Sequence, residues 1–238
     1  MKNTIKWVFV LCAISLSGLP TEAQLIRKAE NLIQKNGGLS EKDAADGIKE
    51  ALTKGTNEGV KLVSVVNGYF GNPSIKIPFP PDAKIMETKL RAVGLGNKVD
   101  EVVLSINRAA EDAAAAAAPI FIDAIRKMSI QDAVQIVRRD QHAATSYLSN
   151  HTSAALKVAF KPTIKSSLDK VNATKYWDEL VKTYNKLPFV KKMNPDLAKY
   201  VTSKAIDGLF IMVANEEEKI RKDPMARTSD LLKKVFGN

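Results

Sequence analysis

The sequence has one cysteine and two histidines, and this scarcity excludes several kinds of catalytic site. Cys12 lies near the N-terminus, and a chain that loses this end has no thiol left for a disulfide, a nucleophile or a metal. His142 and His151 are nine residues apart and, without cysteine, cannot build a histidine/thiolate zinc site. We therefore predict no metal site and no catalytic residues of these types.

The glycine motifs that bind phosphates or expose a nucleophile are also missing. The sequence contains neither GxSxG nor GxxxxGK[ST], and Gly94-Leu95-Gly96 lacks the third glycine and preceding strand of a dinucleotide site. We predict no cofactor and no nucleotide-driven activity.

Residues 1–23 have the three parts of a secretory signal peptide: basic Lys2 and Lys6, an apolar run, and the small-residue exit at Ala23. The run from Trp7 to Leu19 is shorter than the roughly 20 residues of a bilayer-spanning helix, so cleavage after Ala23 is favoured over an uncleaved anchor. We expect an exported, soluble chain in the periplasm or cell envelope, without a transmembrane segment in its mature form.

Basic residues exceed acidic ones, and the excess is confined to one half of the chain. Residues 24–118 carry 13 basic and 12 acidic side chains, whereas residues 119–238 carry 21 and 13. A basic surface favours an anionic lipid, an anionic glycan or another envelope protein, and export makes nucleic acid the least favoured partner. Lys157, Lys161 and Lys165 form a stripe at four-residue spacing and are the candidate contacts, although such lysines are equally typical of a solvated helix face.

Apolar residues recur at three- and four-residue spacing nearly everywhere, which predicts an all-α fold, a single multi-helix bundle over residues 24–238. Residues 24–38 are predicted to form a first helix that can detach from the rest of the bundle. The exception is the proline-rich strap at about 72–81, read as an extended segment or short strand that presses Ile75, Ile77 and Phe79 onto the bundle.

Helix boundaries follow from capping residues, glycines and prolines. Ser40 with Asp43, and Ser129 with Asp132, have the pattern of helix starts. Helices are predicted over residues 41–66, through the alanine run to a break at Pro119, over 120–128 and from 129 to at least 148. Shorter helices punctuated by Pro162, Asn172, Pro188 and Pro195 should follow.

The C-terminal part should contain one long helix and one short helix. The long helix, 195–222, has a centre that is apolar on all sides and is predicted to be buried. Asp223-Pro224 ends it, and a short helix capped by Thr228 or Ser229 should dock onto the bundle. In the second helix, Gly55 and Gly59 predict close approach by a neighbouring helix.

Two acids lie inside apolar runs, Asp123 and Asp207, and a buried carboxylate needs a partner. Arg108 and Arg126 are candidate partners, and the four residues are our candidate ligand-binding set. The same residues could be structural ion pairs, or Asp123, Asp207 and Glu216 could meet in the cleft of a carboxylate-dependent envelope hydrolase.

Two further polar stretches have alternative interpretations. Residues 138–148 could recognise a small ligand or form a helix junction capped by Asp140. Glu217 with Arg221, and Glu218 with Lys222, have the spacing of ion pairs on a solvated helix.

A set of segments between residues 40 and 238 resembles a bacterial family, the domain of unknown function 4197. The matching strings are NPSIKIPFP, VLSINRAAEDAA, PIFIDAIRKMSIQDA, AATSYL, WDELVKTYNKLP and YVTSKAIDGLFIMVANEEEKIRKDPMARTSDLLKKVFG. The resemblance implies an exported helical protein without an assigned activity, and hence without catalytic residues to transfer. Many members resemble lipoproteins, whereas this sequence lacks the lipid-attachment cysteine motif.

The sequence thus favours a non-enzymatic envelope protein that binds an anionic or amphipathic partner. The alternatives are the carboxylate-dependent hydrolase and a purely structural assembly protein, which would need an exposed apolar patch.

Overall fold

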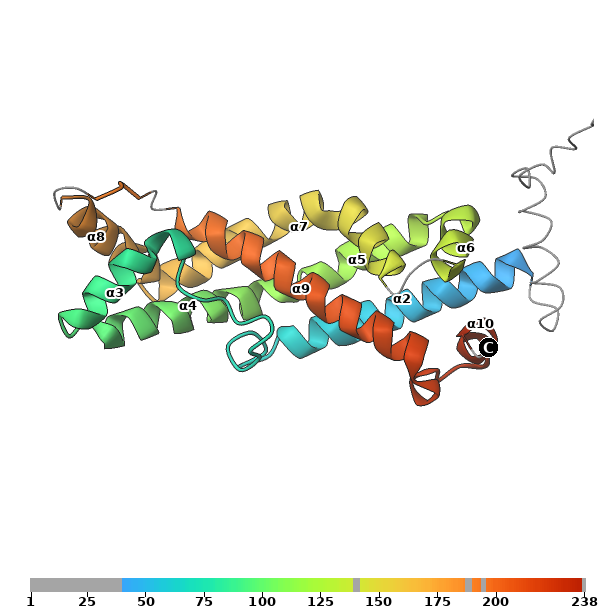
Figure 1. Cartoon of the computed structure of the whole chain (residues 1–238). Helices are drawn as coiled ribbons and strands as arrows, with labels where there is room; N and C mark the ends of the chain where they lie inside the picture. The colour runs from blue at the N-terminus through green and yellow to red at the C-terminus, as the bar shows by residue number, and fades with distance from the viewer. Residues whose placement is uncertain (1–39, 139–141, 187–189, 194–195, 237–238) are drawn as a thin grey trace, which may run out of the picture. The chain divides into compact units, whose positions relative to one another are not determined.

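The computed structural model describes residues 40–138, 142–186, 190–193 and 196–236. Residues 41–238 form one unit of packed helices (Figure 1). The expected signal peptide, its cleavage after Ala23 and the expected first helix at 24–38 lie outside the described residues, and so do Asp140, Pro188 and Pro195.

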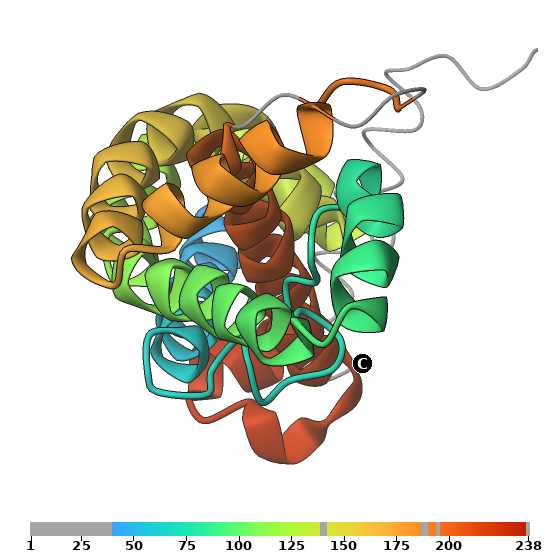
Figure 2. The ribbon, with the colours of Figure 1, turned by 90° about the vertical axis from the view of Figure 1, so that its left-hand side faces the viewer.

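The described residues contain α-helices and two short 3-10 turns, and no β-strand, so the all-α prediction is confirmed. The elements in chain order are α2 (Glu41–Val63), η1 (Pro81–Ala83), α3 (Lys84–Ala92), α4 (Gly96–Ala114), α5 (Ala117–Lys127), α6 (Ile130–Arg138), α7 (Ala143–Lys170), α8 (Ala173–Asn185), α9 (Leu197–Lys222), η2 (Pro224–Ala226) and α10 (Asp230–Phe236). Helix α9 packs against α2, α4, α7 and α8, and Figure 2 shows the bundle from one end.

The glycines of α2 allow α9 to approach closely, as the sequence predicted. A Cβ atom placed on Gly59 would lie 3.5 Å from the backbone nitrogen of Val213, and one on Gly55 would lie 3.5 Å from Cβ of Glu216. Gly47, which lies eight residues before Gly55 on the same helix, faces α10 instead. The glycines of α2 therefore allow two different helices, α9 and α10, to pack closely against it.

The proline-rich strap begins with a turn at residues 73–75, where the prediction of an extended segment is wrong, and continues as irregular backbone. It buries the three predicted side chains, Ile75, Ile77 and Phe79. It does not form a strand, because its backbone pairs with a side chain and not with another strand. The Ile77 N–H donates to Oδ1 of buried Asn107 at 2.8 Å, and Nδ2 of Asn107 donates to the Ile77 carbonyl at 2.8 Å. One side-chain amide thus satisfies both backbone polar groups of a buried residue.

A second buried side chain holds the chain just before the strap. Glu111 on α4 accepts the N–H groups of Tyr69 and Phe70 at 3.0 and 3.1 Å, and Arg108 donates to it at 2.6 Å. The Tyr69 hydroxyl donates to the carbonyl of Ala205 on α9 at 2.6 Å. Burial, with the nearby Glu111 charge, raises the pKa of Tyr69, so its hydroxyl stays a donor.

The alanine run packs tightly, but its helix breaks earlier than predicted. The predicted break was Pro119, whereas α4 ends at Ala114 and α5 begins at Ala117. A proline ring clashes with the carbonyl four residues before it, here that of Ala115, so the chain turns upstream of the proline. Pro119 then lies inside the first turn of α5, where a proline is tolerated.

The predicted helix from 129 to 148 is two helices, α6 and α7. Its start is correct: the Asp132 N–H donates to Ser129 Oγ at 3.1 Å, and Ser129 Oγ donates to the Asp132 carboxylate at 2.7 Å. The prediction that Pro162 ends a helix is wrong, since Pro162 lies within α7. Pro162 is exposed, and water can reach the carbonyl that loses its donor. The predicted break at Asn172 is present, with a φ of 56°.

The centre of α9 is less buried than predicted. Ile206, Leu209 and Val213 are buried, but Ile211 is 42% exposed, because one side of α9 faces solvent. The interpretation of this helix as apolar on all sides therefore overestimated its burial.

The short C-terminal helix α10 docks onto the bundle, as predicted. Leu232 is fully buried and packs with Ala51 of α2 and Ile220 of α9. Ser229 is the cap, because its Oγ accepts the Leu232 N–H at 3.1 Å.

Replacement of Gly208 tests the contact between α9 and the strap. A Cβ on Gly208 would lie 2.8 Å from the Tyr69 ring and 3.1 Å from Cβ of Ile75, both of which are held in place. We expect Gly208→Ala to lower the free energy of unfolding by about 1–3 kcal/mol, measured by denaturant titration. The control, Gly55→Ala, meets only ordinary contacts and should be neutral or stabilising by up to about 1 kcal/mol. Equal effects of the two replacements would contradict this account.

Candidate functional site

The four residues of the predicted ligand-binding set are distributed over three helices. Arg108 lies on α4, Asp123 and Arg126 lie on α5, and Asp207 lies on α9. None of them lines either of the two large cavities described below.

Asp123 and Asp207 are exposed, and their predicted pairing with arginines is wrong. The Asp123 side chain is 61% exposed and pairs with Lys127 at 2.7 Å, and that of Asp207 is 56% exposed and pairs with Lys204 at 3.1 Å. Each acid sits between apolar neighbours in sequence, but the 3.6-residue period turns it to the opposite side of its helix. Proximity to apolar residues along the chain was therefore a poor guide to burial.

The described residues show no cleft in which the three candidate carboxylates meet. Asp207 and Glu216 are nine residues apart on α9, which places them about 13 Å apart along its axis. Glu216 pairs with Lys219 at 3.7 Å. The positions of these carboxylates therefore do not support a carboxylate-dependent hydrolase.

A polar cavity of about 510 Å³ lies between α6 and α7. Both histidines of the chain, His142 and His151, contribute to its wall. The other polar lining residues are Asp132, Gln135, Ser146, Tyr147 and Asn150. The described part of the polar stretch 138–148 thus contributes both to a helix junction and to a cavity. Sequence reasoning missed Gln135, Asn150 and His151, because only the packing of α7 beside α6 brings them together.

Tyr147 and His151 form a flat pair in this cavity. Their rings stack with centroids 4.0 Å apart and an interplanar angle of 24°. Nδ1 of His151 lies 2.8 Å from the Tyr147 carbonyl oxygen, which can only accept, so Nδ1 carries a proton and Nε2 of the neutral ring can accept. Partial burial, and secondarily the charge of Asp132, raises the pKa of Tyr147, so its hydroxyl is a donor near neutral pH.

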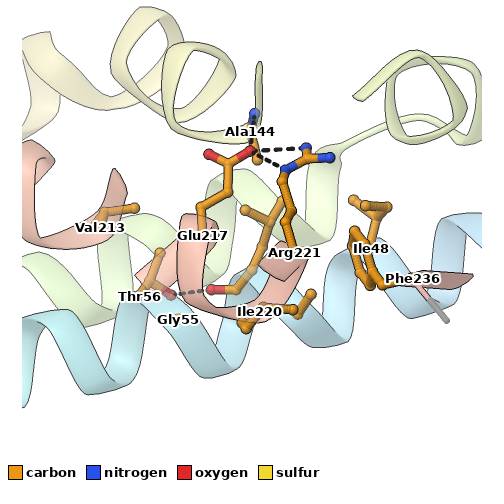
Figure 3. A pocket seen from close by; sticks show the side chains of 11 residues that line it. Ile48, Gly55, Thr56, Ala144, Val213, Glu217, Ile220, Arg221 and Phe236 are labelled. Atoms are coloured by element: carbon orange, nitrogen blue, oxygen red, sulfur yellow. Dashed lines mark hydrogen bonds and ion pairs between the residues drawn. The ribbon is translucent and has the colours of Figure 1, made fainter. Parts of the chain in front are cut away.

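Glu217 of α9, whose side chain is buried, holds the start of α7, which contributes to the cavity wall (Figure 3). Its carboxylate accepts the N–H groups of Ala144 and Thr145 at 3.2 and 2.8 Å and the Thr145 hydroxyl at 2.7 Å. These are unpaired amides of the first turn of α7, where a negative charge is favoured. Glu217 therefore does for α7, from another helix, what a capping residue does locally.

Arg221 completes this buried group. Its Nε and Nη2 donate to Glu217 at 3.0 and 2.9 Å, and Nη2 also donates to the carbonyl of Ile136 on α6 at 3.1 Å. The predicted Glu217–Arg221 pair is confirmed, but its assignment to a solvated face is wrong. Glu217 continues the buried spacing of Leu209 and Val213 at four-residue steps, and this signal could have revealed it.

A small cavity lies beside this ion pair, between α2, α9, α10 and Ala144 at the start of α7 (Figure 3). Ile48, Gly55, Val213 and Phe236 contribute to its mainly apolar wall. Its volume of about 20 Å³ is close to that of a single water-sized site, so it is a packing defect too small for an organic ligand.

The outer face of α7 carries the predicted lysine stripe. Lys157, Lys161 and Lys165 are all exposed. Lys165 pairs with Asp169 at 2.7 Å, whereas Lys157 and Lys161 make no ion pair with any described residue. No acidic residue occurs between positions 143 and 168, so most of this helix presents positive charge alone.

A second large cavity, an open groove of about 690 Å³ between α3, α4 and α8, has mainly apolar walls. Leu95, Leu104, Val171 and Tyr176 line it and are each 38–50% exposed. It is an exposed apolar surface of the kind that an assembly protein would need.

Among the described residues, no three His, Cys, Asp or Glu side chains converge in a way that could hold a metal ion. In the same part of the chain, no helix has the length and apolarity needed to cross a membrane.

These features define an all-helical protein whose described surface has a cavity between α6 and α7, an apolar groove and an exposed row of lysines. Residues 38–237 match the model of the family described as protein of unknown function (DUF4197), and the chain belongs to that family. No curated protein and no solved structure matches the chain.

The role of Glu217 can be tested against its exposed neighbour. Glu217→Gln removes the charge that the Arg221 guanidinium and the amides of α7 require, and should destabilise the protein by about 3 kcal/mol, measured by denaturant titration. Glu218→Gln removes an exposed pair with Lys222 and should leave the unfolding midpoint nearly unchanged. Similar midpoints for both variants would show that the buried pair does not hold the junction.

Proposed function

We propose that this chain is an exported, non-enzymatic binding protein of the bacterial cell envelope whose partner is anionic. The contact surface is the outer face of α7. The observation that carries the proposal is the row of exposed lysines Lys157, Lys161 and Lys165 on a helix without acidic residues from 143 to 168.

Charge on this face is available to a partner because little of it is neutralised within the chain. Only Lys165 has an ion-pair partner, and that pair is exposed. Exposed pairs of this kind contribute little and exchange readily for a stronger partner. A row of cations along one helix attracts a polyanion or an anionic surface, and salt weakens this attraction.

The chemistry of the face favours lipid head groups or anionic glycans over nucleic acid. Residues 157–204 contain 11 lysines and no arginine, and base or bidentate phosphate recognition depends on the guanidinium group. An exported location, which the N-terminal sequence predicts, points the same way.

Co-sedimentation with anionic and neutral phospholipid vesicles at about 10 mM and 150 mM salt tests this surface. We expect retention on anionic vesicles at low salt only. Lys157→Gln/Lys161→Gln/Lys165→Gln should lower the binding constant by about tenfold or more, because each basic residue at the surface contributes to the attraction.

The matched control removes three exposed, unpaired lysines elsewhere, as Lys61→Gln/Lys89→Gln/Lys199→Gln. It has the same net charge as the α7 variant, so equal losses would mean that overall charge and not the α7 face governs binding. Absence of retention on any anionic surface at low salt would remove the proposal.

A second candidate function, an assembly protein, is favoured by the apolar groove between α3, α4 and α8. Covering Leu104, Val171 and Tyr176 would remove partly exposed apolar side chains from water. In this case the chain would form a stable complex through the groove.

Native mass spectrometry over a range of protein concentrations tests the assembly function. We expect oligomers whose population falls in Leu104→Gln/Val171→Gln, because the added amides would have to lose water on burial. Val66→Gln, at a 73% exposed position outside the groove, is the control. A monomer at every concentration, or equal oligomer populations in both variants, would exclude self-assembly through the groove.

A further inference from the structure

The α6–α7 cavity and the lysine row lie along one side of α7. Starting at Tyr147, steps of four, seven, three and four residues lead through His151 and Val158 to Lys161 and Lys165. Positions at this spacing share one face of a helix, and the stripe extends about 27 Å from its first residue to its last. Val158, between the cavity residues and the lysines, is 77% exposed. A long ligand could therefore contact the cavity and the lysines together.

The cavity at the start of the stripe has the chemistry to bind hydroxyl groups. The amides of Gln135 and Asn150 and the hydroxyl of Ser146 each donate and accept hydrogen bonds. Asp132 accepts, and the Tyr147 hydroxyl donates, since its raised pKa keeps it protonated. A ligand hydroxyl also donates and accepts, so a polyhydroxylated ring can satisfy this mixed set. An acyl chain would leave the same groups without partners.

The stacked Tyr147 and His151 rings provide a flat aromatic surface beside these polar groups. The face of an aromatic ring carries partial negative charge, and the C–H groups on the face of a sugar ring carry partial positive charge. A sugar ring can thus pack on this pair while its hydroxyls reach the polar side chains. The volume of about 510 Å³ lies within the range of small-ligand sites.

We propose that this stripe binds an acidic saccharide chain. One sugar ring occupies the α6–α7 cavity, and the acidic groups of the following sugars lie beside Lys157, Lys161 and Lys165. The inference rests on the proposed function, because the lysine row supplies the attraction, and it adds the class of ligand. Asp132 contributes a carboxylate to the cavity wall and accepts a hydrogen bond from Ser129. Because this carboxylate repels acidic groups, the cavity takes a neutral part of the ligand.

Calorimetric titration at about 10 mM salt, with hexagalacturonate as the acidic probe and maltohexaose as the uncharged probe, tests the inference. We expect hexagalacturonate to bind at least about tenfold more tightly than maltohexaose. Tyr147→Ala and Asn150→Ala should each weaken hexagalacturonate binding by about tenfold, and neither should change binding to anionic vesicles. Asn57→Ala, at an exposed site on α2, is the control for both. Circular dichroism of each variant shows whether it is folded, and Asn150→Ala serves alone if Tyr147→Ala is not.

The outcomes separate this inference from the proposed function. If the wild-type chain binds anionic vesicles but not hexagalacturonate, the saccharide inference is overturned and the anionic surface stands. If hexagalacturonate binds equally to Asn150→Ala and Asn57→Ala, or if the cavity variants lose vesicle binding as well, the cavity does not select a sugar and the inference is overturned. If the chain binds neither probe nor vesicles, both proposals fail.

Discussion

The carboxylate of Glu217 is the point on which the arrangement of three helices depends. It lies on α9, accepts the amides at the start of α7, and shares its charge with Arg221, which in turn donates to a carbonyl of α6. A buried charge is costly unless it is paired and hydrogen-bonded, so this carboxylate accommodates only geometries that bring all of its donors together. Other angles between α6 and α7 would break either the bonds of Glu217 to α7 or the bond from Arg221 to α6. The polar cavity above it therefore has a fixed wall.

The same principle operates at the proline-rich strap. Asn107 and Glu111, one turn apart on α4, take up the backbone groups of the strap and of the turn before it. Apolar contacts of Ile75, Ile77 and Phe79 bring the strap to the helices, but such contacts have little direction. The hydrogen bonds decide its register. Apolar burial and a few buried polar side chains thus have separate roles in this fold.

The positive charge of the chain lies outside this framework. The buried basic and acidic groups pair with each other, whereas the lysines of α7 project from an exposed face. Their attraction to an anion therefore does not compete with folding, and their replacement should change binding more than stability. The cavity differs, because its polar groups come from two helices whose relative position the buried carboxylate fixes. The α6–α7 cavity and the lysine row thus lie on one helix.

The sequence by itself determined the all-α class, the burial of the strap residues, the close approach at Gly55 and Gly59, the cap at Ser129, and the exposed row from Lys157 to Lys165. Each of these follows from local spacing or from the chemistry of one residue, so no knowledge of neighbours was needed. Tertiary structure alone decided that Asp123 and Asp207 face solvent while Glu217 is buried, that α6 and α7 are separate helices, and that His142 and His151 share a cavity. Burial depends on which side of a helix its neighbours cover, and a cavity depends on the angle between helices, and the sequence pattern of a single helix specifies neither.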